Sequence, residues 1–253
     1  IDFQLISEKI SRNTKAIIAV HLYGLPANLD QLNQIAIENN LILIEDAAQA
    51  HGAFYKNKRI GSHSDLVCWS FYPGKNLGCF GDGGAITTNN KELSEKLKVL
   101  RNYGSEKKYI HKIKGINSRL DPIQAAILRV KLKHLDFWNN RRRAIAEQYK
   151  SLINNQKIIT PYFPIDMKSS HHLFVIKCSF RDELIEYLNN NYIESLIHYP
   201  IPPHMQKAYV NQYKGRVKLP ITIDLSNQIL SLPIGPHMDV DMVNHVIDVV
   251  NRF

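Results

Sequence analysis

The stretch AIIAVHLYGLPANLDQLNQIAIENNLILI, residues 16–44, contains two short apolar segments on either side of a longer amphipathic one. Residues 16–20 and 41–44 consist of aliphatic, mostly branched side chains, which is typical of buried strands. The intervening residues 29–39 have the spacing of a helix. A strand, a helix and a second strand in this order predict a parallel pair joined by a crossover helix. The sequence therefore indicates an α/β fold.

The same alternation of strands and helices continues along the chain as far as residue 149. The further elements expected are strands at 66–71 and 84–88 and helices at 92–100 and 121–149. In the last helix, Asp121 is the expected N-cap, Pro122 the first helical residue and Gln124 the partner in a capping box. This pattern predicts a mostly parallel sheet covered by helices.

The region after residue 152 has a different character and opens with the sequence NNQKIITPYFP. Its expected elements are a strand within 171–180, a helix over 181–191, a strand ending at His198 and Tyr199, and a proline-rich loop at 199–203. We therefore expect a large domain at 1–152 and a smaller C-terminal α+β domain at 153–253.

Composition limits the class of protein. The 253 residues are 44% hydrophobic and 22% charged, as in ordinary globular proteins, and no apolar run is long enough to span a membrane. The net charge of +9 comes from scattered Lys and Arg, which suits an anionic small substrate better than a nucleic acid. Cys68, Cys79 and Cys178 lack metal-ligand spacing, so we expect structural thiols, no metal site and a cytoplasmic location.

A single lysine lies among five glycines in SFYPGKNLGCFGDGGAI, residues 70–86. A phosphate-binding nucleotide loop is excluded, because Trp69 and Asn76 occupy the places that such a loop reserves for Gly and for Ser or Thr. The glycines do not match the dinucleotide-binding fingerprint either. Lys75 therefore lies on a glycine-rich turn at the end of a strand, where the backbone can approach a ligand closely.

Other polar residues follow the ends of neighbouring strands. In LILIEDAAQAHGA, residues 41–53, Asp46 comes just after the expected strand, and Gln49 and His51 follow it. Taken singly, each residue has an ordinary explanation. Asp46 could cap the next turn, and Gln49 and His51 could be polar surface residues. Ser70 could be an ordinary hydroxyl of the strand. Ligands of such sheets bind at the carboxyl ends of strands, however. Together these side chains supply what pyridoxal phosphate requires: an amine, an acid for the pyridine nitrogen and donors for the phosphate.

Six segments resemble the DegT/DnrJ/EryC1/StrS family of sugar aminotransferases, which are fold type I enzymes that use pyridoxal phosphate to aminate nucleotide-linked keto sugars. They are AIIAVHLYG, LILIEDAAQAHGA, SFYPGKNLGCFGDGGAI, LRNYG, GINSRLDPIQAAIL and HYPIPPHMQ. The resemblance implies that Lys75 binds the cofactor covalently and transfers the proton, and that Asp46 pairs with the pyridine nitrogen. It also implies that Gln49 lies against the oxygen side of the ring and that Ser70 binds phosphate.

The same resemblance implies a homodimer with shared active sites, in which Asn117 reaches the phosphate in the neighbouring subunit. Family members that dehydrate their substrate have His in place of the lysine, so Lys75 favours amino transfer. The expected reaction passes an amino group from glutamate to C3 of a dTDP-linked 3-keto-6-deoxyhexose. His198 and Tyr199 are expected to contact the sugar or its diphosphate, although a rigid connecting loop is the ordinary explanation.

Two alternatives remain open at this stage. A UDP-linked 3-keto sugar is the competing substrate, because the enzymes that use it carry a similar lysine motif. A non-catalytic relic that still binds a nucleotide sugar is the competing kind of protein. Family members also have about a hundred residues or more before AIIAVHLYG. We therefore expect a fragment, or a truncated and inactive product, that exposes apolar sheet surface.

Overall fold

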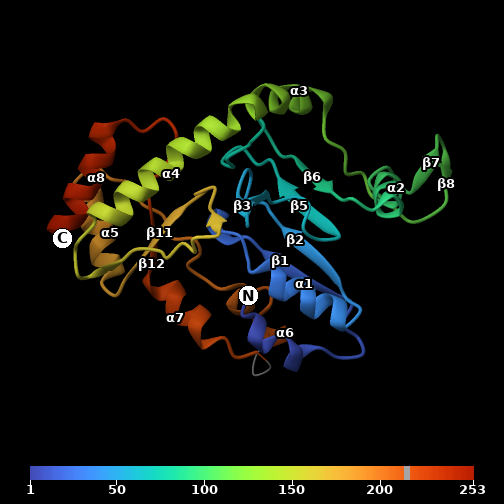
Figure 1. Cartoon of the computed structure of the whole chain (residues 1–253), viewed down its shortest axis with the longest axis horizontal. Coiled ribbons are helices and arrows are strands. Elements are labelled where there is room, and N and C mark those ends of the chain that lie inside the picture. The colour runs from blue at the N-terminus through green and yellow to red at the C-terminus, as the bar shows by residue number, and fades with distance from the viewer. Residues whose placement is uncertain (214–216) are drawn as a thin grey trace. The chain divides into compact units, whose positions relative to one another are not determined.

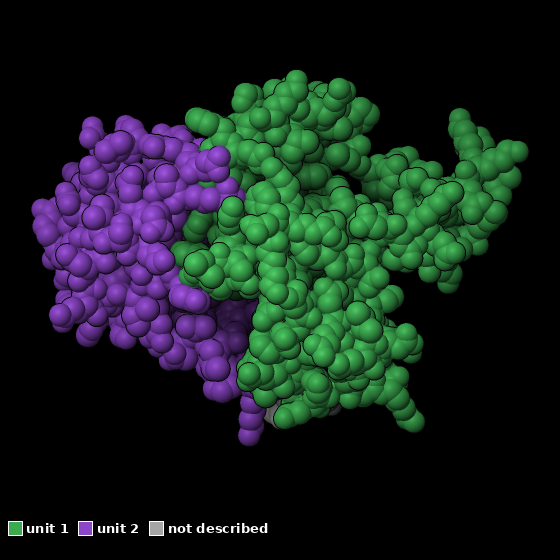
Figure 2. Space-filling model, viewed as in Figure 1, with its two compact units in different colours: residues 1–139, 163–172 green, residues 140–162, 173–253 purple. Residues whose placement is uncertain are grey.

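The structure is a computed structural model that describes residues 1–213 and 217–253. It contains two compact units (Figure 2). The first comprises Ile1–Asn139 and Phe163–His172, and the second comprises Asn140–Tyr162 and Leu173–Phe253. The predicted domain boundary at residue 152 stays a prediction.

A four-stranded sheet forms the centre of the first unit (Figure 1). Its strands are β1 (Ala16–Val20), β2 (Ile42–Asp46), β5 (Leu66–Ser70) and β6 (Gly84–Thr87), in the order β1-β2-β5-β6. The first three run parallel and β6 runs antiparallel to β5, which confirms the mostly parallel sheet. Strand β2 extends two residues beyond the predicted end, so Asp46 is its last residue and pairs with Val20 and Cys68.

The first three helices of this unit begin within one residue of their predicted starts. They are α1 (Leu29–Glu38), α2 (Lys91–Leu100) and α3 (Pro122–Lys131), and α4 (Leu135–Leu152) begins in this unit. Asn28 and Asn90 cap the first two, each accepting a hydrogen bond from a backbone N–H of the first turn. The single long helix predicted at 121–149 is instead two α-helices joined by a 3-10 turn at Leu132–His134.

The capping box predicted at the start of α3 is wrong in part. Asp121 is the N-cap and Pro122 the first helical residue, as expected. The Asp121 side chain makes no capping hydrogen bond, however, and Gln124 Oε1 accepts from the Phe80 N–H at 2.8 Å. Gln124 therefore ties α3 to the glycine-rich segment after Lys75 instead of closing its own helix.

The two faces of the sheet differ in burial. On one face, Ile17, Ala19 and Leu43 pack against Leu32 and Ala36 of α1 and are buried. This burial supplies the hydrophobic stabilisation that holds the helix on the sheet.

The opposite face carries apolar side chains that solvent reaches: Ile18, Val20, Ile42 and Ile86 are 43–59% exposed. The alternation of strand side chains explains the contrast, because residues 17 and 19 face α1 while residues 18 and 20 face the other way.

Shorter elements complete the first unit. They are the sheet β10-β3-β4 (Met167–Lys168, Phe54–Tyr55 and Lys58–Arg59), the hairpin β7 (Ser105–Lys107) and β8 (Ile110–His111), and 3-10 turns at Phe3–Leu5, Ser7–Lys9 and Leu22–Gly24. Strand β10 brings residues 163–172 into this unit, although they follow α4 in the sequence.

The second unit is an antiparallel sheet with helices, as expected for an α+β region. Its elements are β9 (Ile158–Ile159), β11 (Phe174–Cys178), β12 (Ile229–Leu232), α5 (Arg181–Asn190), α6 (Val210–Tyr213), α7 (Pro220–Gln228), α8 (Val240–Arg252) and a 3-10 turn at Pro203–Met205. The strand predicted to end at His198 and Tyr199 is wrong, because only an isolated bridge from Leu196 to Ser231 forms there. None of the helices in the described parts of the chain is both long and apolar enough to cross a bilayer.

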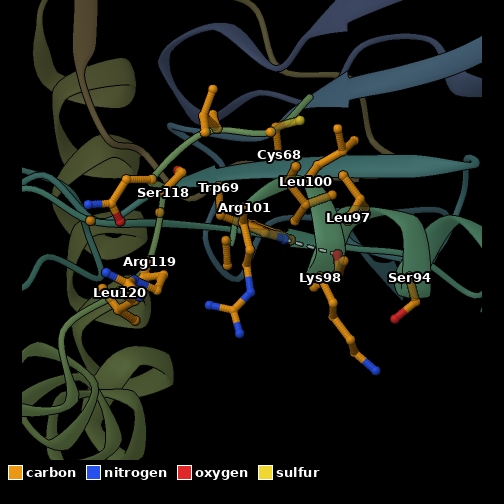
Figure 3. A pocket seen from close by; sticks show the side chains of 18 of the residues that line it. Cys68, Trp69, Ser94, Leu97, Lys98, Leu100, Arg101, Ser118, Arg119 and Leu120 are labelled. Carbon is orange, nitrogen blue, oxygen red and sulfur yellow. Dashed lines mark hydrogen bonds between the residues drawn. The ribbon is translucent and has the colours of Figure 1, made fainter. Parts of the chain in front are cut away.

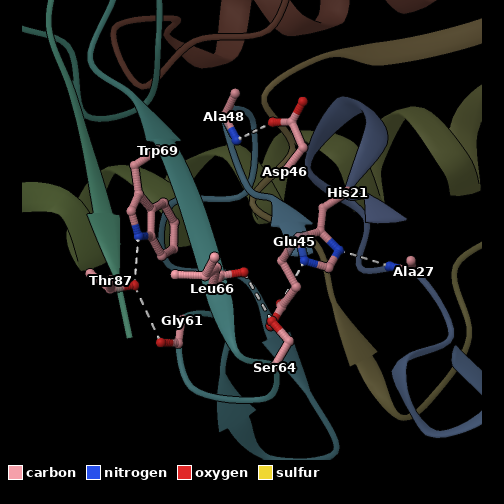
Figure 4. Close-up of polar contacts among 10 residues, drawn as sticks. All are labelled: His21, Ala27, Glu45, Asp46, Ala48, Gly61, Ser64, Leu66, Trp69 and Thr87. Atoms are coloured by element: carbon pink, nitrogen blue, oxygen red, sulfur yellow. Dashed lines mark hydrogen bonds and ion pairs between the residues drawn. The ribbon is translucent and has the colours of Figure 1, made fainter. Parts of the chain in front are cut away.

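A buried polar network joins β1 to β2 (Figure 4). His21 Nδ1 accepts from the Ala27 N–H at 3.0 Å, so Nε2 carries the ring hydrogen and donates to Glu45 Oε2 at 2.8 Å. Ser64 Oγ donates to the other Glu45 oxygen at 2.7 Å. Burial raises the pKa of Glu45, but the hydrogen bonds from His21 and Ser64 outweigh it and hold the pKa below the ordinary 4.5. The carboxylate form therefore stabilises the fold.

Replacing Glu45 by Gln should lower the free energy of unfolding by about 1–3 kcal/mol at neutral pH, because the buried His21 loses its charged acceptor. A depressed pKa contributes stability above the unfolded-state pKa and loses it as pH falls through the folded-state pKa. The difference between parent and variant should therefore shrink below the ordinary value of 4.5. Urea unfolding at neutral and acid pH measures it, with the exposed Glu38→Gln as control. A difference that does not change with pH would contradict this account.

Candidate active site

Lys75 lies on the turn that follows β5, where its N–H donates to the Tyr72 carbonyl at 2.9 Å. Its side chain is half-buried. Burial lowers the pKa of the amine and the Asp46 carboxylate raises it, and the net result is a pKa below the ordinary value for lysine. A lowered pKa leaves more of the amine neutral, which is the nucleophilic form. Asp46 ends the neighbouring strand β2, which runs parallel to β5, so the two residues lie at the same edge of the sheet.

Asp46 is the last residue of β2 and lies on the opposite face of the strand from Glu45 (Figure 4). Its Oδ1 accepts from the Ala48 N–H at 3.1 Å, which orients the carboxylate at the strand end. A carboxylate held in this way can accept a hydrogen bond from a protonated ring nitrogen or stabilise a nearby positive charge.

Gln49 and His51 are buried, with exposed fractions of 7% and 3%, so the reading of both as surface polar residues is wrong. Gln49 Oε1 accepts from the Tyr23 N–H at 2.6 Å. This hydrogen bond fixes the orientation of the amide, with Nε2 as its donor end. The contact between Gln49 and Tyr23 was not predicted from the sequence. The local signal for it is the glycine that follows Tyr23, because in the structure both residues have positive φ angles, 59° and 98°, and form a tight turn.

His51 packs its ring against Trp69 and Phe71, at centroid distances of 5.3 and 5.9 Å. Burial, with a smaller effect from the Lys75 charge, lowers the pKa of His51 to about 4, so the ring is neutral at physiological pH. Trp69 and Phe71 are the residues on either side of Ser70 in the chain, so the His51 ring packs next to the candidate site. Its role here is packing beneath the strand end.

Ser70 ends β5, and its Oγ accepts from the Tyr72 N–H at 3.3 Å. A serine hydroxyl in this position keeps its own hydrogen for donation to an anionic group. The structure therefore brings four predicted residues to the carboxyl ends of β2 and β5: Asp46, Gln49, Ser70 and Lys75.

Asn117 lies elsewhere in the first unit. It lines a cavity of about 1470 Å³ bounded by β6, α2 and residues 114–121 (Figure 3). None of the other four predicted residues lines this cavity. Its side chain is exposed, and its backbone forms a bridge with Asn102. The expected contact of Asn117 with a phosphate in a neighbouring subunit stays a prediction.

His198 and Tyr199 belong to the second unit. His198 Nδ1 lies 2.8 Å from Ser231 Oγ in a hydrogen bond, and Tyr199 is 52% exposed. The two rings meet edge to face at a centroid distance of 5.5 Å. Their expected contact with the substrate stays a prediction.

Comparison with known proteins adds independent findings. The model of the DegT/DnrJ/EryC1/StrS aminotransferase family matches residues 1–251. The dTDP-3-amino-3,6-dideoxy-alpha-D-galactopyranose transaminase of Aneurinibacillus thermoaerophilus is 51% identical over 100% of this chain and 69% of its own length. The dTDP-3-amino-3,4,6-trideoxy-alpha-D-glucose transaminase of Streptomyces venezuelae is 47% identical over 100% of this chain and 67% of its own.

A solved structure shows the same similarity. The crystal structure of S. venezuelae DesV in complex with a ketimine intermediate superposes with a TM-score of 0.97 at 47% identity. The match covers 100% of this chain and 68% of the solved chain. The strands and helices described above therefore follow those of the solved chain over the whole matched length.

Proposed function

This chain belongs to the DegT/DnrJ/EryC1/StrS aminotransferase family, and from that membership we propose that it transfers an amino group from glutamate to the C3 keto group of a dTDP-linked 3-keto-6-deoxyhexose. Two relatives at 47% and 51% identity are transaminases of dTDP-linked 3-amino sugars, which supports both the reaction and the nucleotide. The observation that carries the proposal is the placement of Lys75 and Asp46 at the carboxyl ends of the neighbouring parallel strands β5 and β2.

Pyridoxal phosphate is the proposed cofactor, and the donor set of this chain fits it. Asp46 supplies a carboxylate for the pyridine nitrogen, Ser70 a hydroxyl for the phosphate, and Gln49 an amide whose orientation Tyr23 fixes. When bound, the cofactor supplies an electron sink for the pair of electrons left on the substrate carbon. Asn117 of a neighbouring subunit is proposed to complete the phosphate site, which makes the homodimer part of the enzyme.

Each residue then has a defined task. Lys75 Nζ would hold the cofactor and, when free, would move the proton at the substrate carbon, since a half-buried amine of lowered pKa can both accept and return it. Asp46 would hold a proton on the ring nitrogen of the bound cofactor, because a carboxylate beside that nitrogen favours its charged form. Gln49 and Ser70 orient the ring and the phosphate.

On the substrate side, we propose that His198 and Tyr199 contact the sugar or its diphosphate. The net charge of +9 favours the approach of an anionic nucleotide sugar. Cys68, Cys79 and Cys178 are free thiols, which supports a cytoplasmic location.

The proposed function is tested by identifying the product of the reaction. The intact enzyme with pyridoxal phosphate and glutamate should convert a dTDP-linked 3-keto-6-deoxyhexose to its 3-amino sugar, detected by mass spectrometry. A UDP-linked 3-keto sugar, assayed in parallel, should react far more slowly. Preference for the UDP substrate would overturn the nucleotide assignment. Cofactor binding without turnover of either substrate would identify a non-catalytic relic.

A further inference from the structure

A buried amide lies beside the candidate catalytic lysine. Asn76 follows Lys75 directly and is 5% exposed. Its Nδ2 donates to Asn139 Oδ1 at 2.9 Å and to the Ser170 carbonyl at 2.8 Å, which uses both hydrogens of the amide. The turn that carries Lys75 is therefore held to residues 63 and 94 positions further along the chain.

The two partners of Asn76 each reach the segment that follows β2. Asn139 Nδ2 donates to the His51 carbonyl at 2.7 Å, and Ser170 Oγ donates to the Gln49 carbonyl at 2.8 Å. Both side chains are fully buried. The hydrogen bonds thus run from the Lys75 turn to the backbone of the segment that carries Gln49, one arm through the Asn139 side chain and the other through the carbonyl and hydroxyl of Ser170.

Two glycines make room for these side chains. A Cβ at Gly52, where φ is +72°, would lie 2.5 Å from Asn139 Nδ2. A Cβ at Gly24, where φ is +98°, would lie 2.3 Å from Ser170 Oγ. Both the space and the backbone angle at these positions require glycine, so the close approach of Asn139 and Ser170 is built into the fold.

We propose that Asn76, Asn139 and Ser170 form a buried brace that positions Lys75 against the Asp46–Gln49 segment. Breaking one of its hydrogen bonds leaves a buried polar group without its partner, so the fully bonded arrangement is strongly favoured. The brace keeps the lysine turn at a set depth and so keeps the amine partly shielded from water. Asn76, Asn139 and Ser170 are positioning residues in this account, which rests on the function proposed for Lys75.

The test measures the amine itself, without cofactor or turnover. Ser170→Ala removes one hydroxyl and no charge. In the intact protein freed of cofactor, labelling with trace acetic anhydride at about pH 8, followed by mass spectrometry, compares Lys75 with the exposed Lys150. Loosening the turn admits water to the amine, so the labelling ratio should fall about threefold, equivalent to a rise of about half a pKa unit.

A matched control separates positioning from general stability. Ser226 is 6% exposed and its hydroxyl donates to the Ile223 carbonyl at 2.8 Å, the length of the Ser170 bond, but it lies on α7 in the second unit. Ser226→Ala should lower the melting temperature to a similar degree and leave the Lys75 labelling unchanged. If Ser226→Ala lowers the ratio as far as Ser170→Ala does, the brace has only a structural role.

A second variant changes Asn139, the other partner of Asn76. It tests the positioning of Lys75 even if Ser170→Ala does not fold. Asn139→Leu has a similar volume and removes the bonds to Asn76 and to the His51 carbonyl, so it should lower the labelling ratio in the same direction. A ratio equal to that of the parent protein in each variant that folds would overturn the proposal. The two proposals fail in different measurements. If the proposed function is wrong, the substrate is not turned over, whereas the labelling of Lys75 uses protein without cofactor and does not depend on turnover.

Discussion

Lys75→Arg should abolish the glutamate half-reaction, lowering its rate by about 10⁴-fold or more. Arginine keeps a positive charge and a similar length, but its guanidinium does not deprotonate at physiological pH. It can therefore neither hold the cofactor covalently nor accept the proton from the substrate carbon. Binding of pyridoxal phosphate should stay measurable, because Asp46, Gln49 and Ser70 are unchanged.

The measurement is a single-turnover reaction with glutamate, followed by the absorbance of the bound cofactor. Borohydride treatment and peptide mapping should fix the cofactor to Lys75 in the parent enzyme and to no residue in the variant. Lys150→Arg, an exposed change of the same kind on α4, should behave as the parent does. Conversion of bound cofactor to its amine form by Lys75→Arg would remove Lys75 from the catalytic role.

Asp46→Asn should slow both half-reactions by about 10²–10³-fold, because a neutral amide no longer favours the proton on the pyridine nitrogen. The fold should be retained, since the Asn side-chain oxygen can still accept from the Ala48 N–H as Asp46 does at 3.1 Å. The Asp46 charge also raises the pKa of Lys75, so its removal should lower that pKa further. In Asp46→Asn, acetic anhydride labelling of Lys75 should therefore be faster than in the parent protein, while the turnover of the enzyme is slower.

A second carboxylate provides the control for this variant. Asp65 accepts from the Leu43 N–H at 3.1 Å and lies before β5, at the other end of the strand from Ser70. Asp65→Asn should leave both half-reactions and the Lys75 labelling near parent values. An unchanged rate in Asp46→Asn, or an equal loss in both variants, would show that Asp46 does not act on the cofactor.

The sequence by itself determined the α/β class and located the strands at whose ends the candidate site lies. This was possible because the relevant signals are local. Strand β1 was predicted at its observed bounds, since five aliphatic residues in a row report burial without reference to any partner. Asp46 and Lys75 were proposed because each lies at or just after the end of such a strand, and parallel strands bring their carboxyl ends to one edge.

The errors arose where a local pattern competed with a distant partner. Gln124 has the spacing of a capping box, but the Phe80 N–H, 44 residues earlier, takes its side-chain oxygen. The helix predicted over 121–149 keeps its helical composition through residues 132–134, where the structure has a tighter turn. Neither result follows from spacing along the chain, because side-chain hydrogen bonding depends on which groups the fold brings near.

Only the tertiary structure decided how the site is held. Asn76, Asn139 and Ser170 are ordinary polar residues in the sequence, and they lie 63 to 94 positions away from one another where they bond. Their importance comes from burial, since a polar group removed from water must find its partner within the protein. Hydrophobic periodicity is a property of consecutive residues, so it can be recognised from the sequence alone. The pairing of buried polar groups depends on how separate segments pack, and it exists only in the folded protein.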